Sequence, residues 1–268
     1  MFSALRNRRA RMLISVVVDE WLRSIEYLSD NTQKEYKRII HDFTINLSKK
    51  YVQSITSVDV NRYLSKFAWH HENSTVNKHL MGIKSFFRFL EGAYSITNVT
   101  IGLRKRKEKM PYRPFISKKD LDKILQSATQ KEADIIRMLA HTGMRCSELA
   151  GLRPENISPN LSSITIQGKG GKVRTIPCNQ TVREILSRSI NFSMNRKTIY
   201  SICRTSGHRV HISLSPHMLR RHFATTLLSK GVSLLIISRL LGHSSVQTTE
   251  RYLCIDSSFL LGSTDVLD

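Results

Sequence analysis

Residues 215–252, late in the chain, read SPHMLRRHFATTLLSKGVSLLIISRLLGHSSVQTTERY. The apolar residues of this stretch recur every three or four positions in two runs, which predicts two amphipathic helices. His217 and Arg220 are three positions apart in the first run, so both side chains can project from one face. Gly242 ends the second run, and a polar segment then leads to Tyr252. The stretch therefore predicts a helical domain in which two charge-handling groups meet ahead of a tyrosine.

Two further motifs precede this stretch. Residues 142–149 read TGMRCSEL, which places Arg145 three positions before Glu148. Residues 168–177 read GKGGKVRTIP, which predicts a turn carrying Lys169 between two short antiparallel strands. One such motif alone is a weak signal, whereas several in a fixed order are a strong one.

Together the motifs resemble the signature of the tyrosine recombinases, the family of lambda integrase and the Xer proteins. The resemblance implies a mainly α fold: an N-terminal four-helix core-binding (SAM-like) bundle and a mostly helical catalytic domain with a small antiparallel β-sheet, forming a C-shaped DNA clamp. The implied activity is site-specific recombination, in which DNA strands are cleaved and rejoined through a covalent 3′-phosphotyrosine. Such an enzyme integrates, excises or resolves DNA and needs no cofactor, metal or ATP.

The resemblance assigns the bond-making steps to four residues. Tyr252 is the nucleophile, and Arg145 and Arg220 clamp the phosphate. Arginine suits this role because its guanidinium stays protonated and offers paired donors to phosphate oxygens. Lys169 protonates the leaving 5′-oxygen, and Lys172 in the same turn is its rival.

Three further residues have supporting roles in the resemblance. His217 bonds the phosphate or assists proton transfer, and His243 donates a hydrogen bond to a phosphate oxygen. Glu148 orients the groups around it. The sequence departs from the family at Arg221 and His222, where relatives usually have histidine followed by a small residue, and this leaves the role of His222 open.

Composition independently indicates a polyanionic partner. The chain of 268 residues has 42 Lys and Arg against 21 Asp and Glu, a formal charge of +21. Residues 1–113 hold 21 basic and 10 acidic side chains (+11), which leaves 21 and 11 (+10) for the rest. Both parts are therefore expected to contact double-stranded DNA. Four widely spaced cysteines indicate reduced thiols, no apolar run is long enough for a membrane span, and we expect a cytoplasmic, nucleoid-associated protein.

Domain boundaries follow from the apolar patterns. Residues 1–102 show four helical periods and no strand pattern, which predicts the core-binding bundle. The second and third helices are expected to be capped by Asn31 or Thr32 and by Ser57, and the fourth to start at Ser74. Residues 103–114, LRKRKEKMPYRP, predict a basic linker, and residues 115–268 the catalytic domain.

Polar side chains on the predicted bundle could reach phosphates or base edges in a major groove. These candidates are Asn31, Thr32, Lys34, Lys37, Asn77, Lys78, Lys84 and Arg88. The neighbouring aromatic stripe, Phe86, Phe87 and Phe89, is instead predicted to be core because of its helical spacing.

Assembly is expected to involve residues 255–267, which hold an apolar cluster, Phe259-Leu260-Leu261, soon after the tyrosine. We predict that this tail docks on a neighbouring copy and supports a homotetramer on two duplexes, with docking on its own domain as the alternative. An accessory DNA-bending protein or a partner recombinase is a further expected partner. Two alternative functions are a type IB-like topoisomerase and a non-catalytic helix-turn-helix protein, for which residues 236–252 could serve as the reader.

Overall fold

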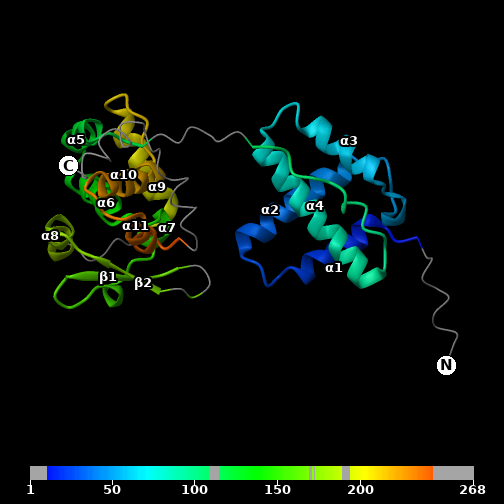
Figure 1. Cartoon of the computed structure of the whole chain (residues 1–268), viewed down its shortest axis with the longest axis horizontal. Coiled ribbons are helices and arrows are strands. Elements are labelled where there is room, and N and C mark those ends of the chain that lie inside the picture. The colour runs from blue at the N-terminus through cyan, green and yellow to red at the C-terminus, as the bar shows by residue number, and fades with distance from the viewer. Residues whose placement is uncertain (1–10, 109–114, 169–170, 172, 189–193, 244–268) are drawn as a thin grey trace, which may run out of the picture. The chain divides into compact units, whose positions relative to one another are not determined.

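The structure, a computed structural model, describes residues 11–108, 115–168, 171, 173–188 and 194–243. The chain divides into two compact units, residues 1–111 and 112–268 (Figure 1). Among the described residues, none of the helices combines the length and the hydropathy that crossing a membrane requires.

The first unit is a four-helix bundle, as its apolar periods predict. Its helices are α1 (Ile14–Ser24), α2 (Asp30–Ile45), α3 (Ser57–Phe67) and α4 (Asn73–Tyr94), with a short 3₁₀ turn at Val52–Ser54. Trp21, Phe43, Phe86 and Phe87 are fully buried at its centre. The aromatic stripe is thus core at Phe86 and Phe87, and Phe89 is partly buried against the same cluster.

The helix starts differ from the predicted ones by one to three residues. Ser29, not Asn31 or Thr32, is the N-cap residue of α2. Thr56, not Ser57, caps α3, because its hydroxyl accepts from the Asp59 backbone N–H while the Asp59 carboxylate accepts from the Thr56 N–H. The fourth helix begins at Asn73 rather than at Ser74. Several neighbouring polar residues could each serve as the N-cap, and the sequence alone does not show which one the backbone conformation uses.

A buried polar pair lies inside the bundle. The Tyr63 hydroxyl is 2.7 Å from His79 Nδ1, and His79 is fully buried beneath Phe67 with ring centroids 3.9 Å apart. His79 Nε2 makes no hydrogen bond within the described part of the chain. Burial lowers the pKa of His79 from 6.5 to about 4 and raises the pKa of the Tyr63 hydroxyl well above its ordinary value.

His79 should therefore make the first unit acid-labile. Its folded pKa of about 4 lies below its ordinary 6.5, so between these values the unfolded chain binds more protons. The contribution of neutral His79 to the free energy of unfolding is complete above pH 6.5. It is lost as pH falls toward 4, and the loss is at most about 3 kcal/mol. Both tryptophans, Trp21 and Trp69, lie in this unit, so tryptophan fluorescence during urea unfolding reports on it.

A His79→Gln variant should lose part of the pH dependence in this window, whereas His70→Gln, at an exposed position, should retain it. Equal pH dependence in His79→Gln and the wild type would refute this origin of acid lability.

The segment after α4 is bound to it. Asn77 of α4 is 4% exposed; its amide nitrogen donates to Arg106 O (2.9 Å) and Glu108 Oε1 (2.8 Å), and its amide oxygen accepts from Arg106 N (2.8 Å). Asn73 donates to Lys107 O at 2.8 Å. Residues 103–108, expected to begin a free linker, thus include a stretch that is held on the first unit.

The second unit is mostly helical with one β-hairpin (Figure 1). Its helices are α5 (Lys118–Ser127), α6 (Gln130–Thr142), α7 (Cys146–Ala150), α8 (Gln180–Arg188), α9 (Arg196–His208), α10 (Pro216–Ser229) and α11 (Leu234–Leu241), with a 3₁₀ turn at Pro154–Asn156. Strands β1 (Ser163–Gln167) and β2 (Val173–Pro177) pair antiparallel, with Ser163 opposite Pro177 and Gln167 opposite Val173. This confirms the predicted antiparallel pair of short strands.

Single residues fix the start of α10 and the packing at the end of α9. Ser215 caps α10, and Pro216 follows in the first turn, where its missing N–H costs nothing. Helix α9 continues through Gly207 and ends at His208, although glycine near a helix end commonly marks its stop. A Cβ at Gly207 would lie 2.3 Å from Ile212 O, so glycine is needed there for close packing of the returning chain.

Candidate active site

The turn after α6 positions the first arginine. Gly143 ends α6 with φ of +61°, a conformation that favours glycine, and Arg145 follows as the N-cap residue of α7. A Cβ at Gly143 would lie 2.5 Å from Cδ1 of Phe223, which packs from α10. Residue 143 must therefore be glycine for two reasons, its backbone conformation and its contact with α10.

Gly143→Ala should destabilise the second unit by about 2–5 kcal/mol, the sum of left-handed backbone strain and overpacking against Phe223. Gly231→Ala is the matched control, since Gly231 has φ of +78° but no atom within 4 Å of an added Cβ. It should cost only the strain, about 1–2 kcal/mol. Chemical denaturation followed by far-UV circular dichroism measures both; equal losses in the two variants would show that the Phe223 contact has no weight.

Glu148 lies between two arginines. Its Oε1 accepts from Arg145 Nη1 (2.9 Å) and Arg174 Nη1 (2.9 Å), and its Oε2 accepts from Arg174 Nη2 (2.7 Å) and the Arg145 backbone N–H (2.6 Å). Burial opposes ionisation of this carboxyl, but the hydrogen bonds from Arg174 and then from Arg145 outweigh burial and hold its pKa at about 2. Glu148 is therefore ionised at neutral pH and orients both guanidiniums.

Arg220 is almost completely buried, with 1% of its surface exposed. Its guanidinium donates to the carbonyl oxygens of Gly143 and Leu241, the latter at 2.6 Å, and Nη1 lies 4.0 Å from Glu148 Oε2. These carbonyls belong to the ends of α6 and α11, where backbone acceptors lack helical partners and a cation is favoured. The fold thus fixes this guanidinium between two helix ends.

His243 completes the described cluster. Its Nε2 lies 3.2 Å from Arg220 Nη2, and because a guanidinium only donates, Nε2 accepts and the ring proton lies on Nδ1. Burial, followed by the charges of Arg220, Arg145 and Arg174, lowers its pKa to about 4. His243 is therefore neutral at pH 7.

His217 lies at the start of α10 and is exposed. Its pKa is lowered by partial burial of the imidazole ring and then by the charges of Arg220, Arg221 and Arg145. The structure thus brings Arg145, Glu148, Arg220 and His243 into contact, with His217 beside them. Lys169, its rival Lys172 and Tyr252 lie outside the described residues.

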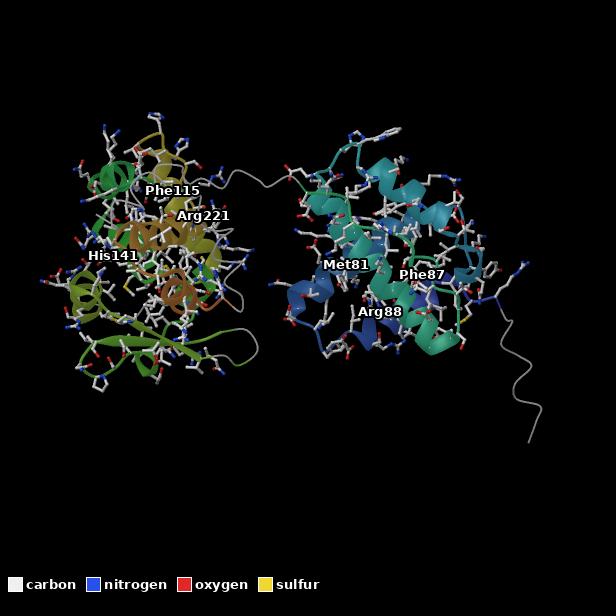
Figure 2. The ribbon with its side chains drawn as sticks, in the orientation of Figure 1. Met81, Phe87, Arg88, Phe115, His141 and Arg221 are labelled. Atoms are coloured by element: carbon white, nitrogen blue, oxygen red, sulfur yellow. The ribbon has the colours of Figure 1, made fainter. Side chains whose placement is uncertain are left out.

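The two residues after Arg220 have structural surroundings of their own. His222 Nδ1 donates to the Ile116 carbonyl oxygen at 2.8 Å, which ties α10 to the start of the second unit. Arg221 is partly buried on the same helix (Figure 2). The departure from the family pattern at His222 therefore coincides with a packing contact rather than with the cluster around Glu148.

The candidate DNA-contacting residues of the first unit differ in availability. Lys34, Lys37, Lys78 and Arg88 are exposed, as is Asn31, while Thr32 and Lys84 are partly buried. Arg88 and Met81, which is 39% exposed, both lie on α4 (Figure 2). The prediction for Asn77 is corrected by the structure. Its side chain is buried and its amide is hydrogen-bonded to residues 106 and 108, so Asn77 is no longer a candidate for reading bases.

The charges around Glu148 do not balance. Among the described residues, the three guanidiniums of Arg145, Arg174 and Arg220 surround one ionised carboxylate, which leaves a formal excess of +2 beside neutral His243. Fixed cationic donors of this kind can stabilise negative charge that develops on a phosphodiester. Arg145, whose side chain is 39% exposed, is the most accessible of the three.

Sequence reasoning missed Arg174. It stands in the quoted segment GKGGKVRTIP, yet a strand position alone does not reveal which partner its side chain meets. The period of two along a strand was the available signal, because it places Arg174 on the same face as Ile176, which is buried, and an arginine on an inward face needs a counter-charge.

Sequence profiles of known protein families match residues of both units. The sequence profile described as "Phage integrase family" matches residues 114–258, more than half of the chain. The chain belongs to the phage integrase family. The profile "Phage integrase, N-terminal SAM-like domain" matches residues 18–94 of the first unit.

Similar curated members of the family include tyrosine recombinases. Tyrosine recombinase XerA of Pyrococcus furiosus is 29% identical, over 94% of this chain and 94% of its own length. Tyrosine recombinase XerD of Staphylococcus aureus is 26% identical, over 91% of this chain and 96% of its own length.

Solved structures show that the fold is shared. A lambda integrase dimer bound to a core site has a TM-score of 0.78 at 18% identity, with 90% of this chain and 95% of that chain covered. A lambda integrase tetramer bound to a Holliday junction has a TM-score of 0.78 at 16% identity, over 91% and 78%.

Proposed function

We propose that this phage integrase family member is a site-specific DNA recombinase that cleaves and rejoins strands through a covalent 3′-phosphotyrosine at Tyr252. The observation that carries the proposal is the cluster of Arg145, Glu148, Arg220 and His243, with its excess of fixed positive charge. Such a cluster has little use in a protein that only reads bases, but it suits a reaction in which charge grows on phosphate oxygens.

The proposed reaction exchanges one phosphate ester for another. The Tyr252 hydroxyl loses its proton, for which His217 is the candidate acceptor, and its Oη bonds to phosphorus while the bond between phosphorus and the 5′-oxygen breaks. Lys169 gives a proton to that leaving oxygen. A 5′-hydroxyl from another strand then returns its proton to Lys169 and attacks the phosphotyrosine, so that the bond between phosphorus and Oη breaks and the tyrosine oxygen recovers a proton. Because the ester is conserved, the reaction needs no nucleotide cofactor.

Within the cluster, we assign the phosphate contacts to Arg145, Arg220 and His243. Glu148 holds Arg145 in place, so its ionised carboxylate fixes the direction of the donors rather than reacting. His217, exposed on the first turn of α10, is assigned to a phosphate contact or to proton transfer at the tyrosine. To donate to the phosphate through Nε2, His243 would change tautomer, so that the ring proton moves from Nδ1 to Nε2.

Both units are proposed to bind one duplex. We infer a core-binding domain at residues 1–102 with residues 103–108 beside it, a linker that continues to residue 114, and a catalytic domain at 115–268. The exposed Lys34, Lys37, Lys78 and Arg88 are the proposed contacts of the first domain. We propose that recombination takes place on nucleoid DNA in the cytoplasm.

The proposed assembly is four copies on two duplexes, since recombination cuts and rejoins four strands. Residues 255–267, outside the described part of the chain, are our candidate for the segment that docks on the neighbouring copy. Their apolar cluster follows Tyr252 closely in sequence, so docking would couple the placement of the nucleophile to assembly. An accessory DNA-bending protein or a second recombinase could join this complex.

The test of this function begins with a DNA site selected by the protein from random-sequence duplexes. A nicked duplex built on that site should trap a covalent complex in the presence of EDTA, visible on a denaturing gel. A plasmid with two copies of the site should yield recombinant products. Relaxed plasmid without recombinants would indicate the topoisomerase alternative, and binding without a covalent complex would indicate a helix-turn-helix reader.

A further inference from the structure

Arg174 connects three elements of the second unit through one side chain. From β2 it donates to both carboxylate oxygens of Glu148 in α7, at 2.9 and 2.7 Å, and through Nε to the Leu240 carbonyl oxygen of α11 at 2.8 Å. The side chain is 10% exposed. A planar guanidinium can make this paired contact and the third bond together, whereas a lysine ammonium cannot reproduce the paired geometry.

The end of α11 is shaped around this side chain. Gly242 has φ of +66°, and a Cβ there would lie 2.9 Å from Arg174 Cδ. Glycine thus permits both the turn and the close approach of the arginine. The next residue is His243, whose ring meets Arg220. Arg174 therefore lies between the carboxylate that holds Arg145 and the turn that presents His243.

We propose that Arg174 is a positioning residue for the strand-cleavage reaction, an inference that rests on the proposed function. It fixes Glu148, and through it Arg145, in one register with the end of α11 that carries His243. Its three bonds go to protein acceptors, so it acts on the phosphate contacts through other residues. A shift of one helix end relative to another misplaces donors whose effect depends on sub-ångström geometry.

The experiment compares Arg174→Lys with Arg209→Lys. Arg209 makes a similar paired contact with Glu132, at 2.7 and 2.7 Å, in the same unit but apart from the cluster. Each variant retains its positive charge and loses a paired Arg–Glu contact. Thermal unfolding, affinity for the selected DNA site and the single-turnover rate of covalent complex formation on the nicked duplex are measured for both.

We expect Arg174→Lys to bind DNA within about threefold of wild type and to form the covalent complex about 10- to 100-fold more slowly per folded molecule, the size of effect seen when a supporting shell is removed. Arg209→Lys should cleave at the wild-type rate even if its Tm falls. Equal cleavage rates in the two variants, after correction for the folded fraction, would overturn the inference.

A pH profile adds a readout that a purely structural ion pair would not move. Arg174 is the leading partner that keeps the pKa of Glu148 low against burial, so its loss should move the acid limb of the cleavage rate to higher pH. Arg209→Lys should leave the limb in place, and an unchanged limb in Arg174→Lys would count against the positioning role.

A measurement without DNA distinguishes failure of the proposed function from failure of the positioning inference. In the ¹H–¹⁵N spectrum of the histidine rings, Arg174→Lys should shift the His243 signals while Arg209→Lys should not. If wild-type protein forms no covalent complex, the proposed function fails, and these shifts still decide the positioning inference: shifted His243 signals support the link from Arg174 to His243, and unshifted ones overturn it.

Discussion

A Tyr252→Phe variant should bind its selected DNA site with unchanged affinity and form no detectable covalent complex. The substitution removes only the phenolic oxygen that attacks phosphorus and leaves the ring and the cationic cluster of Arg145 and Arg220 in place. Loss of a nucleophile in a reaction with a covalent intermediate abolishes the step rather than slowing it. The measurement is a denaturing gel of the nicked duplex after incubation with each protein, together with a mobility-shift titration.

Tyr200→Phe is the matched control, because Tyr200 is a tyrosine of the same unit, 50% exposed on α9. It should form the covalent complex at the wild-type rate. A covalent complex in Tyr252→Phe, with its loss in Tyr200→Phe, would transfer the nucleophile to α9 and overturn the site assignment.

Local patterns predicted much of this fold. Apolar spacing at three and four positions identified the four helices of the first unit, and β-rich runs around a glycine-rich turn identified β1 and β2. Such features depend on residues that are close in sequence, so they can be predicted from one amino-acid sequence. The family motifs added the residues that meet in space, and the structure brings Arg145, Glu148, Arg220 and His243 together.

Features that depend on distant partners were not predicted. Nothing near Asn77 in sequence indicates that it holds Arg106 and Glu108, twenty-nine and thirty-one positions away. Arg174 likewise meets Glu148 across twenty-six positions and Leu240 across sixty-six. Spacing placed Arg220 on one face with His217, but the depth of Arg220 depends on how α6 and α11 end against it.

The burial of Arg220 gives it two roles that a substitution should reveal together. Arg220→Ala leaves two buried carbonyl oxygens, of Gly143 and Leu241, without their donor, at about 1–3 kcal/mol each in the free energy of unfolding. It also removes a fixed cation from the phosphate site, for which we expect covalent complex formation to fall at least about 100-fold per folded molecule. Arg220→Lys should recover part of the stability but little of the rate, since one ammonium cannot reach both carbonyls and His243.

His243 offers an independent measure of the same change. Burial is the main cause of its low pKa and Arg220 the next, so Arg220→Ala should raise that pKa from about 4 toward its ordinary value in an NMR titration. Arg188→Ala, which removes a cation paired with Asp134 elsewhere in the unit, is the control and should leave the His243 titration and the cleavage rate unchanged. If Arg220→Ala lost stability but cleaved normally once folded, the guanidinium would be a brace between α6 and α11 alone, and the phosphate contact would belong to Arg145.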